Sequence, residues 1–424
     1  MLQATPGIHL TLTCSVCGTP ASDGARPCPS CGELLEFTLV ASAVEGDLAA
    51  RFRARRTSDA PIDQSGVWRF RELLPSIPQD AVVTLGENRA PLYSSRTGAA
   101  YAKSERLAYL HLGSNPTGSF KDAGMTVAVS NAKARGATMV VCASTGNTAA
   151  SMAAYAARAG MRALVIVPAT GISESKVAQT LDYGAKVLAI EGDFDAALAL
   201  VRELDPARAE IVNSVNPYRI EGQKCALFAL LEQRAWNPPD WIVIPGGNLG
   251  NSSAFGKALR EAKQLGLIDR VPRIAVVQAA GAAPFVRSFA TGADLVPVKA
   301  DTTATAIKIG APASWRKATR EVKASGGVVV SVSDAEIADA RAIIGIDGVG
   351  CEPASAATLA ALRHLVASKT IGASDDVVLV LTGHVLKDGA FSAAYHASGA
   401  QYANHITRVP AGVEPHRLLE LAEN

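Results

Sequence analysis

Short apolar runs recur along this chain and are separated by stretches that favour helix. The runs are Met139–Cys142, Ala163–Val167, Val187–Ile190, Trp241–Ile244, Ile274–Val277, Val328–Val332 and Val377–Leu381. The intervening stretches are rich in Ala, Leu, Glu and Lys, and they include 148–159, 219–235, 251–265, 334–344 and 353–367. Continuous β-branched runs between helices are typical of buried parallel strands in βαβ units. The pattern therefore predicts an α/β fold with parallel-rich sheets, whose ligand sites lie in loops at the carboxyl ends of strands.

Length and charge narrow the functional class. With 424 residues the chain is long enough for two or three domains. Its 41 Lys and Arg nearly balance 39 Asp and Glu, and aromatic residues make up only 5%, so neither a basic field nor a base-stacking surface for nucleic acid is expected. No apolar run approaches the roughly 18 residues of a membrane span, and Met1–His9 lacks the pattern of a signal peptide. We expect a cytoplasmic protein without a nucleic-acid or membrane partner.

Four of the seven cysteines form two closely spaced pairs, each followed by glycine. The pairs are Cys14-Ser-Val-Cys17 and Cys28-Pro-Ser-Cys31. Two such knuckles supply four thiolates of the kind that bind Zn²⁺, and four sulfur ligands leave no open position, which predicts a structural role. Disulfides are the alternative, which a cytosolic setting disfavours. Residues 9–40 are thus expected to form a small zinc ribbon.

A basic connector follows the ribbon. It carries Arg51, Arg53, Arg55 and Arg56, and we expect a solvated strand or linker without a function. Trp68–Leu74 then reads as a short helix or turn that docks apolar residues on the main body.

Lys121 lies between a rigid turn and a predicted helix, in the segment Ser114-Asn-Pro-Thr-Gly-Ser-Phe-Lys-Asp122. Burial at the positive end of a helix would push its amine toward the neutral, nucleophilic form. A neutral amine condenses with aldehydes, and pyridoxal 5'-phosphate is the commonest aldehyde cofactor. The alternative is a surface lysine that caps a helix, but further loops downstream favour catalysis.

Polar residues follow the first of the predicted strands, at Ser144-Thr145-Gly146-Asn147-Thr148. Hydroxyls, free backbone N–H groups and a helix start converge there, which makes an anion site suited to a carboxylate. Ordinary helix capping by Thr145 or Thr148 is the alternative, but it accounts for one hydroxyl and not for the whole run.

Glycines follow the strand Trp241–Ile244, in the segment Gly246-Gly-Asn-Leu-Gly-Asn251. Glycine lets the backbone wrap closely around a phosphate with its N–H groups pointing inward. Many strand-to-helix turns are rich in glycine, so the signal is weak alone. Beside a candidate cofactor lysine it predicts the seat of the cofactor phosphate.

The strand Val377–Leu381 ends at Thr382-Gly383-His384. A hydroxyl at that point could hydrogen-bond the pyridine nitrogen of the cofactor without protonating it, which favours elimination and replacement over transamination. His384 is the kind of residue that acts as a general base, but Lys121 could move every proton needed.

A turn after Val212 combines amides, a hydroxyl and an arginine, in the segment Asn213-Ser-Val-Asn-Pro-Tyr-Arg-Ile-Glu-Gly-Gln-Lys224. This combination suits a doubly charged anion. A helix start with Pro217 in its first turn is the simpler interpretation, and it is compatible with binding.

These segments together resemble the threonine synthase family, pyridoxal-phosphate enzymes of fold type II. The matching stretches are Asn115–Asp122, Cys142–Gly160, Val215–Lys224, Ala306–Gly310, Pro312–Trp315, Asp347–Leu362 and Leu381–Asp388. The four-cysteine head is similar to that of the longer family members. The resemblance implies two doubly wound α/β/α domains, a large cofactor domain (41–114 and 216–424) and a small domain (115–215). It also implies a homodimer.

The resemblance further implies a role for each matching position. Lys121 would bond the cofactor aldehyde and shuttle protons. The other cofactor contacts would be Phe120 near the ring, Asn147 at the 3'-oxygen, Thr382 at the ring nitrogen, and Gly247, Asn248, Leu249, Gly250 and Asn251 at the phosphate. The substrate carboxylate would meet Ser144, Thr145 and Thr148, and the phosphate of O-phosphohomoserine would meet Ser214, Arg219 and Asn248. The implied reaction removes that phosphate and adds water at Cβ, which gives L-threonine.

Four places depart from the family pattern and leave the substrate open. Ala123 stands where arginine is usual, and His111 stands where an acid is usual. Residues 86–91 (Gly-Glu-Asn-Arg-Ala-Pro) replace a Gly-Glu-Gly-Gly-Thr-Pro turn, and 168–175 replace a Pro-x-Gly-Lys segment. One alternative is β-replacement on O-phosphoserine or a related substrate, as in a cysteate-synthase-like enzyme. Another is a vestigial enzyme body whose zinc ribbon binds a partner.

Overall fold

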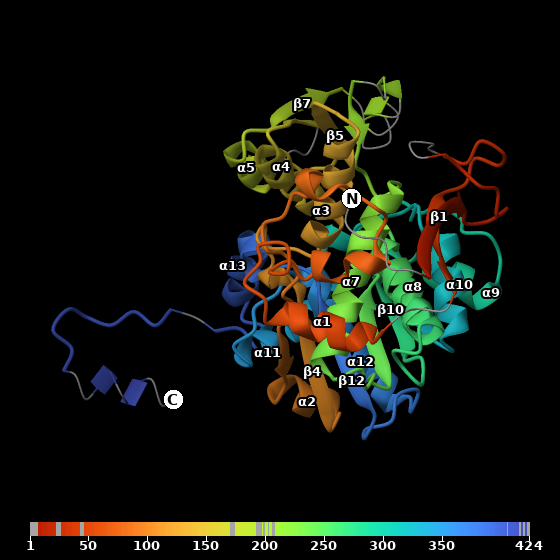
Figure 1. Cartoon of the computed structure of the whole chain (residues 1–424). Coiled ribbons are helices and arrows are strands. Elements are labelled where there is room, and N and C mark those ends of the chain that lie inside the picture. Colours follow the sequence, from red (N-terminus) through yellow and green to blue (C-terminus); the bar gives the residue numbers. More distant parts are fainter. Residues whose placement is uncertain are drawn as a thin grey trace.

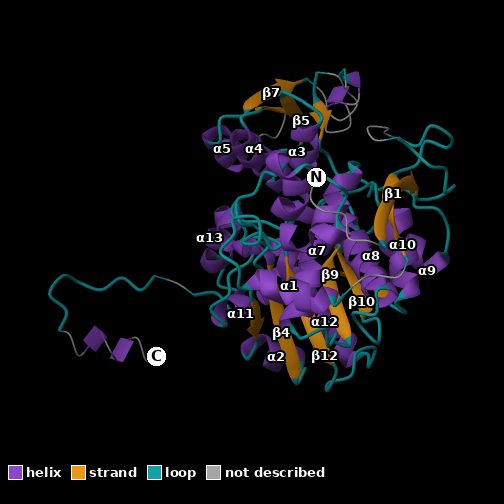
Figure 2. Cartoon of the chain, in the orientation of Figure 1, coloured by secondary structure: helices purple, strands orange, loops and turns teal. Residues whose placement is uncertain are grey.

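Two helix-covered sheets and a small two-stranded ribbon make up the molecule (Figures 1 and 2). The computed structural model describes residues 7–22, 27–42, 46–169, 174–191, 197, 200, 201, 203–205, 208–404, 406–414, 417, 418, 420 and 421. Everything said below about structure concerns these residues. Beyond helix α13 (Gly389–Ala397), the C-terminal segment runs away from the body (Figure 1).

The larger sheet has six strands in the order β11-β10-β9-β12-β4-β3. All neighbours are parallel except β3, which pairs antiparallel with β4. The strands are β3 (Leu92–Ser94), β4 (Arg106–His111), β9 (Trp241–Pro245), β10 (Arg273–Ala279), β11 (Val328–Val332) and β12 (Asp376–Leu381). Every residue of β12 is buried, as expected for a central parallel strand covered on both faces.

The smaller sheet has four parallel strands in the order β7-β6-β5-β8. They are β5 (Met139–Ala143), β6 (Arg162–Pro168), β7 (Lys186–Ile190) and β8 (Glu210–Ile211). It lies above the larger sheet in the view of Figure 1, with α4 and α5 beside it. The predicted α/β class with parallel-rich sheets is confirmed, and each predicted strand lies within two residues of an observed one.

The helices of the large body begin in different ways, and only some of them start at a side-chain cap or at proline. They are α1 (Leu48–Arg56), α2 (Thr97–Ala102), α3 (Lys121–Ala134), α7 (Pro217–Gln233), α8 (Gly250–Gln264), α9 (Pro284–Thr291), α10 (Trp315–Ala324), α11 (Asp334–Ile346) and α12 (Pro353–Ala367). The others are α4 (Asn147–Ala159) and α5 (Glu174–Asp182). Ser333 and Glu336 form a capping box at the start of α11, and Pro217, Pro284 and Pro353 occupy first turns.

The expectation of a strand or linker at the arginine run was wrong, because these residues form α1. The side chain of Asp47 caps the helix by accepting from Ala50 N at 3.0 Å. Arg and Ala are strong helix formers, and buried Phe52 packs edge-on against Phe70 at 5.0 Å between ring centroids. Phe70 lies in the 3₁₀ helix η1 (Trp68–Leu73), which matches the short helix or turn predicted there.

Helix α7 is the core of the molecule and packs against both α3 and α8. A Cβ at Gly222 would lie 1.8 Å from the carbonyl oxygen of Ala123, so only glycine permits this approach to α3. Ala123 is 1% exposed at the same contact. The small residue that departs from the family pattern is therefore part of the helix packing.

Four charged side chains are buried together between α7 and α8. Lys224 Nζ contacts Glu221 at 2.6 Å and Glu261 at 2.8 Å, and Lys257 contacts the same two acids. The two cations and two anions balance, which is what a buried ionic group requires.

The ribbon consists of β1 (Ile8–Cys14) and β2 (Leu35–Ala41), paired antiparallel. It docks on α7 and α10 through specific contacts. Phe37 meets Tyr218 edge-on at 4.9 Å between ring centroids, and Glu36 receives two hydrogen bonds from Arg320, at 2.7 and 2.8 Å. These contacts attach the ribbon to the first turn of α7 through Tyr218 and to α10 through Arg320.

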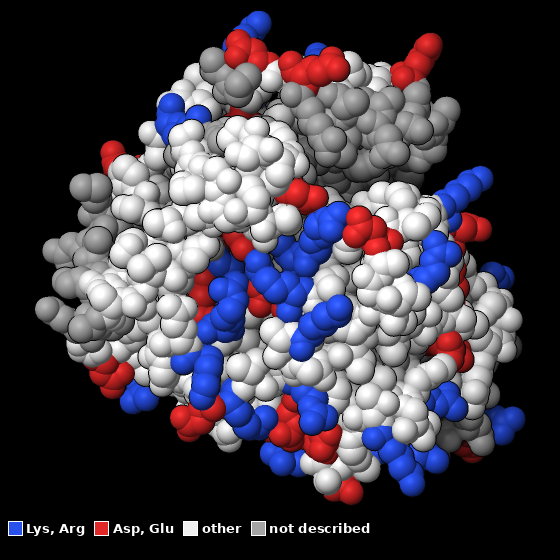
Figure 3. All heavy atoms as spheres, turned by 90° about the vertical axis from the view of Figure 1, so that its right-hand side faces the viewer, with Lys and Arg blue, Asp and Glu red and all other residues white. Residues whose placement is uncertain are grey.

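No helix in the described part of the chain combines the length and the apolar character that crossing a membrane requires. Figure 3 shows the face on which β1, α9 and α10 lie. Basic side chains gather down its middle, with acidic side chains beside them.

Candidate active site

Lys121 is held beside the end of β12 by main-chain hydrogen bonds between two distant segments. The N–H of Phe120 donates to the carbonyl of Thr382 at 2.9 Å, and the N–H of His384 donates to the carbonyl of Gly118 at 2.9 Å. Lys121 is the first residue of α3. The geometry therefore brings the predicted lysine next to the predicted hydroxyl of Thr382.

The surroundings of Lys121 favour a neutral amine. Burial, reinforced by the nearby positive charge of Arg219 and opposed by Glu352, lowers the pKa of Lys121 to about 7. Its Nζ lies 3.9 Å from the ring centroid of Phe120. The residue keeps part of its surface open. The amine of Lys121 is therefore already partly deprotonated at neutral pH.

Glu352 is a site residue to which the sequence analysis gave no role. Its carboxylate accepts from Asn147 Nδ2 at 2.9 Å and from Thr382 Oγ1 at 3.2 Å. Burial raises the pKa of Glu352. Its position directly before Pro353 marks a helix start in the sequence, but it does not indicate that this acid is buried.

Glu352 joins the two sheets across the site. Asn147 begins α4 beside the small sheet, whereas Thr382 ends the central strand of the large sheet. Thr382 is also fixed by Ser355, whose Oγ lies 3.1 Å from its hydroxyl and accepts from its N–H at 2.8 Å. Asn147 and Thr382 are thus linked by hydrogen bonds to the same carboxylate, that of Glu352.

The glycine loop after β9 is a cradle lined by free N–H groups. A Cβ on Gly246 would lie 2.6 Å from Val276 Cγ1, and Leu249 has a left-handed φ of 62°. In the described part of the chain, the N–H groups of Gly247, Asn248 and Leu249 donate to no protein acceptor.

Neighbouring side chains in this loop are also without partners. Both polar atoms of the Asn251 amide and the hydroxyl of Ser252 are buried and have no hydrogen-bond partner among the described residues. Both residues lie in the first turn of α8, which begins at Gly250. Free donors at a helix start fit a phosphate group, and these residues therefore fit the cofactor that Lys121 implies.

Asn248 links this cradle to the turn predicted to bind the substrate phosphate. Its Nδ2 donates to Ser214 Oγ at 2.5 Å, and its Oδ1 accepts from Ala313 N at 2.5 Å. Ser214 and Asn248 are thus brought together, as the sequence resemblance implied.

Arg219 lies on the same side, in the first turn of α7. It is 1% exposed, and its guanidinium donates to the carbonyl of Val212 at 3.2 Å. Its Nε has no partner among the described residues. Burial lowers the pKa of Arg219 to about 10, so the group stays charged and can accept an oxyanion at neutral pH.

The loop from Ser144 to Thr148 is not used for capping. The N-cap of α4 is Gly146 and makes no side-chain capping bond, while Ser144 Oγ accepts from Gly146 N at 3.2 Å. Thr145 and Thr148 make no hydrogen bond within the described residues through their hydroxyls. These hydroxyls therefore remain available to a ligand.

His111 and the segment 168–175 depart from the family pattern, and His384 was considered as a general base. His111 Nε2 lies 3.1 Å from the carbonyl oxygen of Gly350, and burial lowers the pKa of His111. The Nδ1 of His384 accepts from Leu386 N at 3.2 Å, so this imidazole stabilises its own turn. Pro168 ends β6, but residues 170–173 of the segment 168–175 lie outside the described residues.

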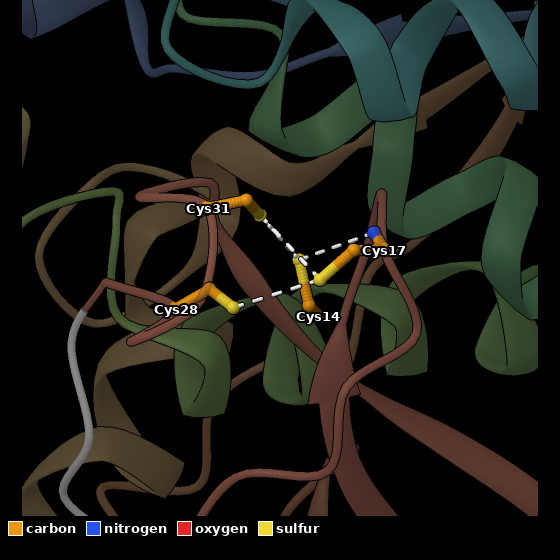
Figure 4. A group of neighbouring side chains, drawn as sticks. All are labelled: Cys14, Cys17, Cys28 and Cys31. Carbon is orange, nitrogen blue, oxygen red and sulfur yellow. Dashed lines mark hydrogen bonds between the residues drawn. The ribbon is translucent and has the colours of Figure 1, made fainter.

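The four paired cysteines converge at one end of the ribbon (Figure 4). Their Sγ atoms all lie within 4.8 Å of one another, with Cys14 and Cys31 at 3.4 Å and Cys17 and Cys28 at 3.8 Å. Four sulfurs at the Zn–S distance of about 2.3 Å stand about 3.8 Å apart in a tetrahedron. The arrangement fits Zn²⁺, and all four thiols are free of disulfides.

The fold and this site define a class of protein. A lysine with a lowered pKa at a helix start, a loop of free N–H groups at a strand end and parallel-rich sheets are features of a pyridoxal-phosphate enzyme of fold type II. A family model described as "Pyridoxal-phosphate dependent enzyme" matches residues 83–383.

Comparison with known proteins narrows the class. The chain is 42% identical over 383 residues to a threonine synthase of Methanosarcina acetivorans, covering 89% of this chain and 92% of that protein. It is 46% identical over 350 residues to a threonine synthase of Synechocystis, covering 82% and 87%. The solved threonine synthase of Escherichia coli has the same fold, with a TM-score of 0.62 at 19% identity and coverage of 89% and 86%. The chain belongs to the threonine synthase family of pyridoxal-phosphate dependent enzymes.

Proposed function

We propose that this chain converts O-phospho-L-homoserine and water to L-threonine and inorganic phosphate. The observation that carries the proposal is the joint presence of Lys121, with its lowered pKa, and the Ser214–Asn248 pair, with Arg219 close enough to act on that lysine. Relatives that cover most of the chain at 42% and 46% identity are threonine synthases, which supports the same substrate.

The cofactor would be held by the residues that the geometry gathers around Lys121. Residues 247–251 would take its phosphate, since their free N–H groups point to an anion. Phe120 would pack near the ring, Thr382 would face the ring nitrogen and Asn147 would face the 3'-oxygen. When bound, the cofactor withdraws electrons from the substrate carbons next to the amino group.

The protein's own groups would bind the substrate and move protons. Ser144, Thr145 and Thr148 would bind the carboxylate at the open start of α4. Lys121 would accept protons from Cα and Cβ and return them at Cα and at Cγ, where the methyl group of threonine forms, and a pKa of about 7 permits both directions near neutral pH.

The phosphate would leave from a second anion site. Arg219, Ser214 and Asn248 would bind it while the Cγ–O bond breaks, and water would then add its oxygen at Cβ. A buried arginine and neutral donors stabilise a departing dianion through charge-assisted hydrogen bonds. The phosphate leaves with the bonding electron pair, so the amino acid is neither oxidised nor reduced overall.

Several features belong to this proposal as well. Zn²⁺ bound by Cys14, Cys17, Cys28 and Cys31 would have a structural role, because four sulfurs complete its coordination. Residues 41–114 and 216–424 would form the large cofactor domain, and 115–215 the small one. The enzyme would act in the cytoplasm as a homodimer.

The test is phosphate release from a panel of phosphorylated amino acids by the holoenzyme. O-phosphohomoserine should release phosphate and yield threonine, and Lys121→Ala should abolish both while the fold is retained by circular dichroism. O-phosphoserine with sulfite or sulfide is the matched comparison. Faster turnover of O-phosphoserine would replace this proposal with β-replacement, and a bound cofactor without any turnover would indicate a vestigial enzyme.

A further inference from the structure

A cavity lined by arginines lies at the junction of α1, η1 and the end of α7. Its volume is about 200 Å³. A water molecule occupies about 30 Å³, so the cavity has room for a small polyatomic ion. The residues that line it are Arg56, Asp63, Gln64, Arg69, Arg89 and Gln233. None of these belongs to the site around Lys121.

Arg69 is the buried arginine of this cavity. It is 6% exposed and forms an ion pair with Glu232 at 2.8 Å, yet its Nε is buried without a partner among the described residues. Burial lowers the pKa of Arg69, and the charges of Arg56 and Arg89 act in the same direction. Arg56 and Arg89 are therefore each close enough to act on Arg69, and all three arginines line the cavity.

Arg56 is the last residue of α1, and the helix is anchored next to it. Arg55 is paired with Glu72 and donates to the carbonyl of Arg69 at 2.6 Å. Arg56 itself is exposed and has no hydrogen-bond or ion-pair partner within the described residues. Its charge is therefore available to a ligand at the entrance.

Arg89 is fixed by a loop with two left-handed residues. Asn88 and Ala90, on either side of it, have φ values of 63° and 32°. A Cβ on Gly66 would lie 1.9 Å from the carbonyl oxygen of Asn88, so the loop packs directly on the segment before η1. Arg89 bonds only the neutral carbonyl and amide of Gln64 in the described structure.

The charges of the cavity do not cancel. Asp63, the one acidic residue among those that line the cavity, forms an ion pair with Arg71 at 2.6 Å, and Glu232 forms an ion pair with Arg69. Arg56 and Arg89 remain without an acidic partner in the described part of the chain. Arginine's fork of donors matches oxyanions, and phosphate above all.

We propose that this cavity is a second anion site, which binds a small dianion carrying a phosphate group. Arg69 forms its floor, and Arg56 and Arg89 close over the ion from the rim. The inference is independent of the proposed reaction, since it shares no residue with the site around Lys121.

The experiment is calorimetric titration of the holoenzyme with inorganic phosphate. Because Arg69 is buried against Glu232 and its replacement risks unfolding, the test variant is Arg56→Gln combined with Arg89→Gln, both at exposed positions. The matched control is Arg53→Gln, an exposed arginine of the same helix outside the cavity. Arg219→Gln removes the arginine near Lys121 and separates binding there from binding in the cavity.

The wild type, Arg53→Gln and Arg219→Gln should all retain one class of phosphate binding that the double variant loses by at least tenfold in affinity. Raising the ionic strength from about 0.01 to about 0.15 M shortens the screening length from about 30 to about 8 Å, and it should weaken this class. Glycerol phosphate tests whether an ester is also accepted, which would extend the ligand from the free ion to monoesters. Equal binding by the double variant, or binding of acetate as tight as that of phosphate, would overturn the proposal.

Discussion

The reactivity of Lys121 should depend on pH in a way that no exposed lysine shows. Lowering the pKa from 10.5 to about 7 changes the neutral fraction at pH 7 from about 0.03% to about half, a gain of about 10³-fold. In the cofactor-free enzyme, a small aldehyde with a mild hydride donor should therefore label Lys121 with a midpoint near pH 7. Mass spectrometry of the Lys121 peptide measures this, and free N-acetyl-lysine gives the reference curve near about 10.4.

Two neighbours should move this midpoint in opposite directions. Arg219 lowers the pKa of Lys121, so Arg219→Gln should raise the midpoint by about one unit, which corresponds to about 1.4 kcal/mol. Glu352 acts in the other direction, so Glu352→Gln should lower the midpoint. A wild-type midpoint near 10, or shifts of the same sign in both variants, would refute this account of the site.

Three other expectations follow from the geometry. Cys17→Ser, at an exposed ligand position, should lower the zinc content from about one per chain and lower the melting temperature, since structural zinc contributes folding energy. Gly246→Ala should weaken cofactor binding, measured by equilibrium dialysis, at least tenfold, because the new Cβ would lie 2.6 Å from Val276 Cγ1. The control is Gly345→Ala, where a Cβ meets open space, and this variant should leave the stability unchanged or raise it by about 0.5–1 kcal/mol. Lys121 has a lower pKa folded than unfolded, so stability of the cofactor-free enzyme should rise with pH between about 7 and 10.5, and Lys121→Met should remove that part of the rise in chemical denaturation.

The seven apolar runs from Met139 onward were predictable as strands because parallel strands buried on both faces read as continuous apolar runs, whereas β3 and β4 were not among the predicted strands. Helix α12 (Pro353–Ala367) was predicted to the residue, since proline and alanine define its start and length. The arginine run was misread because its charges suggested solvent. A helix with one anchoring aromatic, Phe52, carries little periodic signal over nine residues.

The sequence singled out Lys121 and Thr382 from their local motifs, and the structure places the two segments side by side, while their chemical roles stay predictions. Pairing between segments was not predictable, because nothing local shows that Asn147 and Thr382 share one acid. Glu352 accepts from both, and a buried acid of this kind is recognised only from the packing around it. The arginine cavity could not be predicted from the sequence for the same reason, since Arg56 and Arg89 are far apart in the chain and line one cavity only after folding.

The position of β12 bears on how the protein is made. This strand lies between β9 and β4 and is synthesised about 260 residues after Lys121. At about 5–20 residues per second, β4 waits roughly 10 to 50 s on the ribosome with an unpaired edge. During that interval the site around Lys121 lacks β12 and the residues that follow it. Exposed strand edges invite pairing with other chains, so the nascent chain should depend on holding chaperones until β12 emerges.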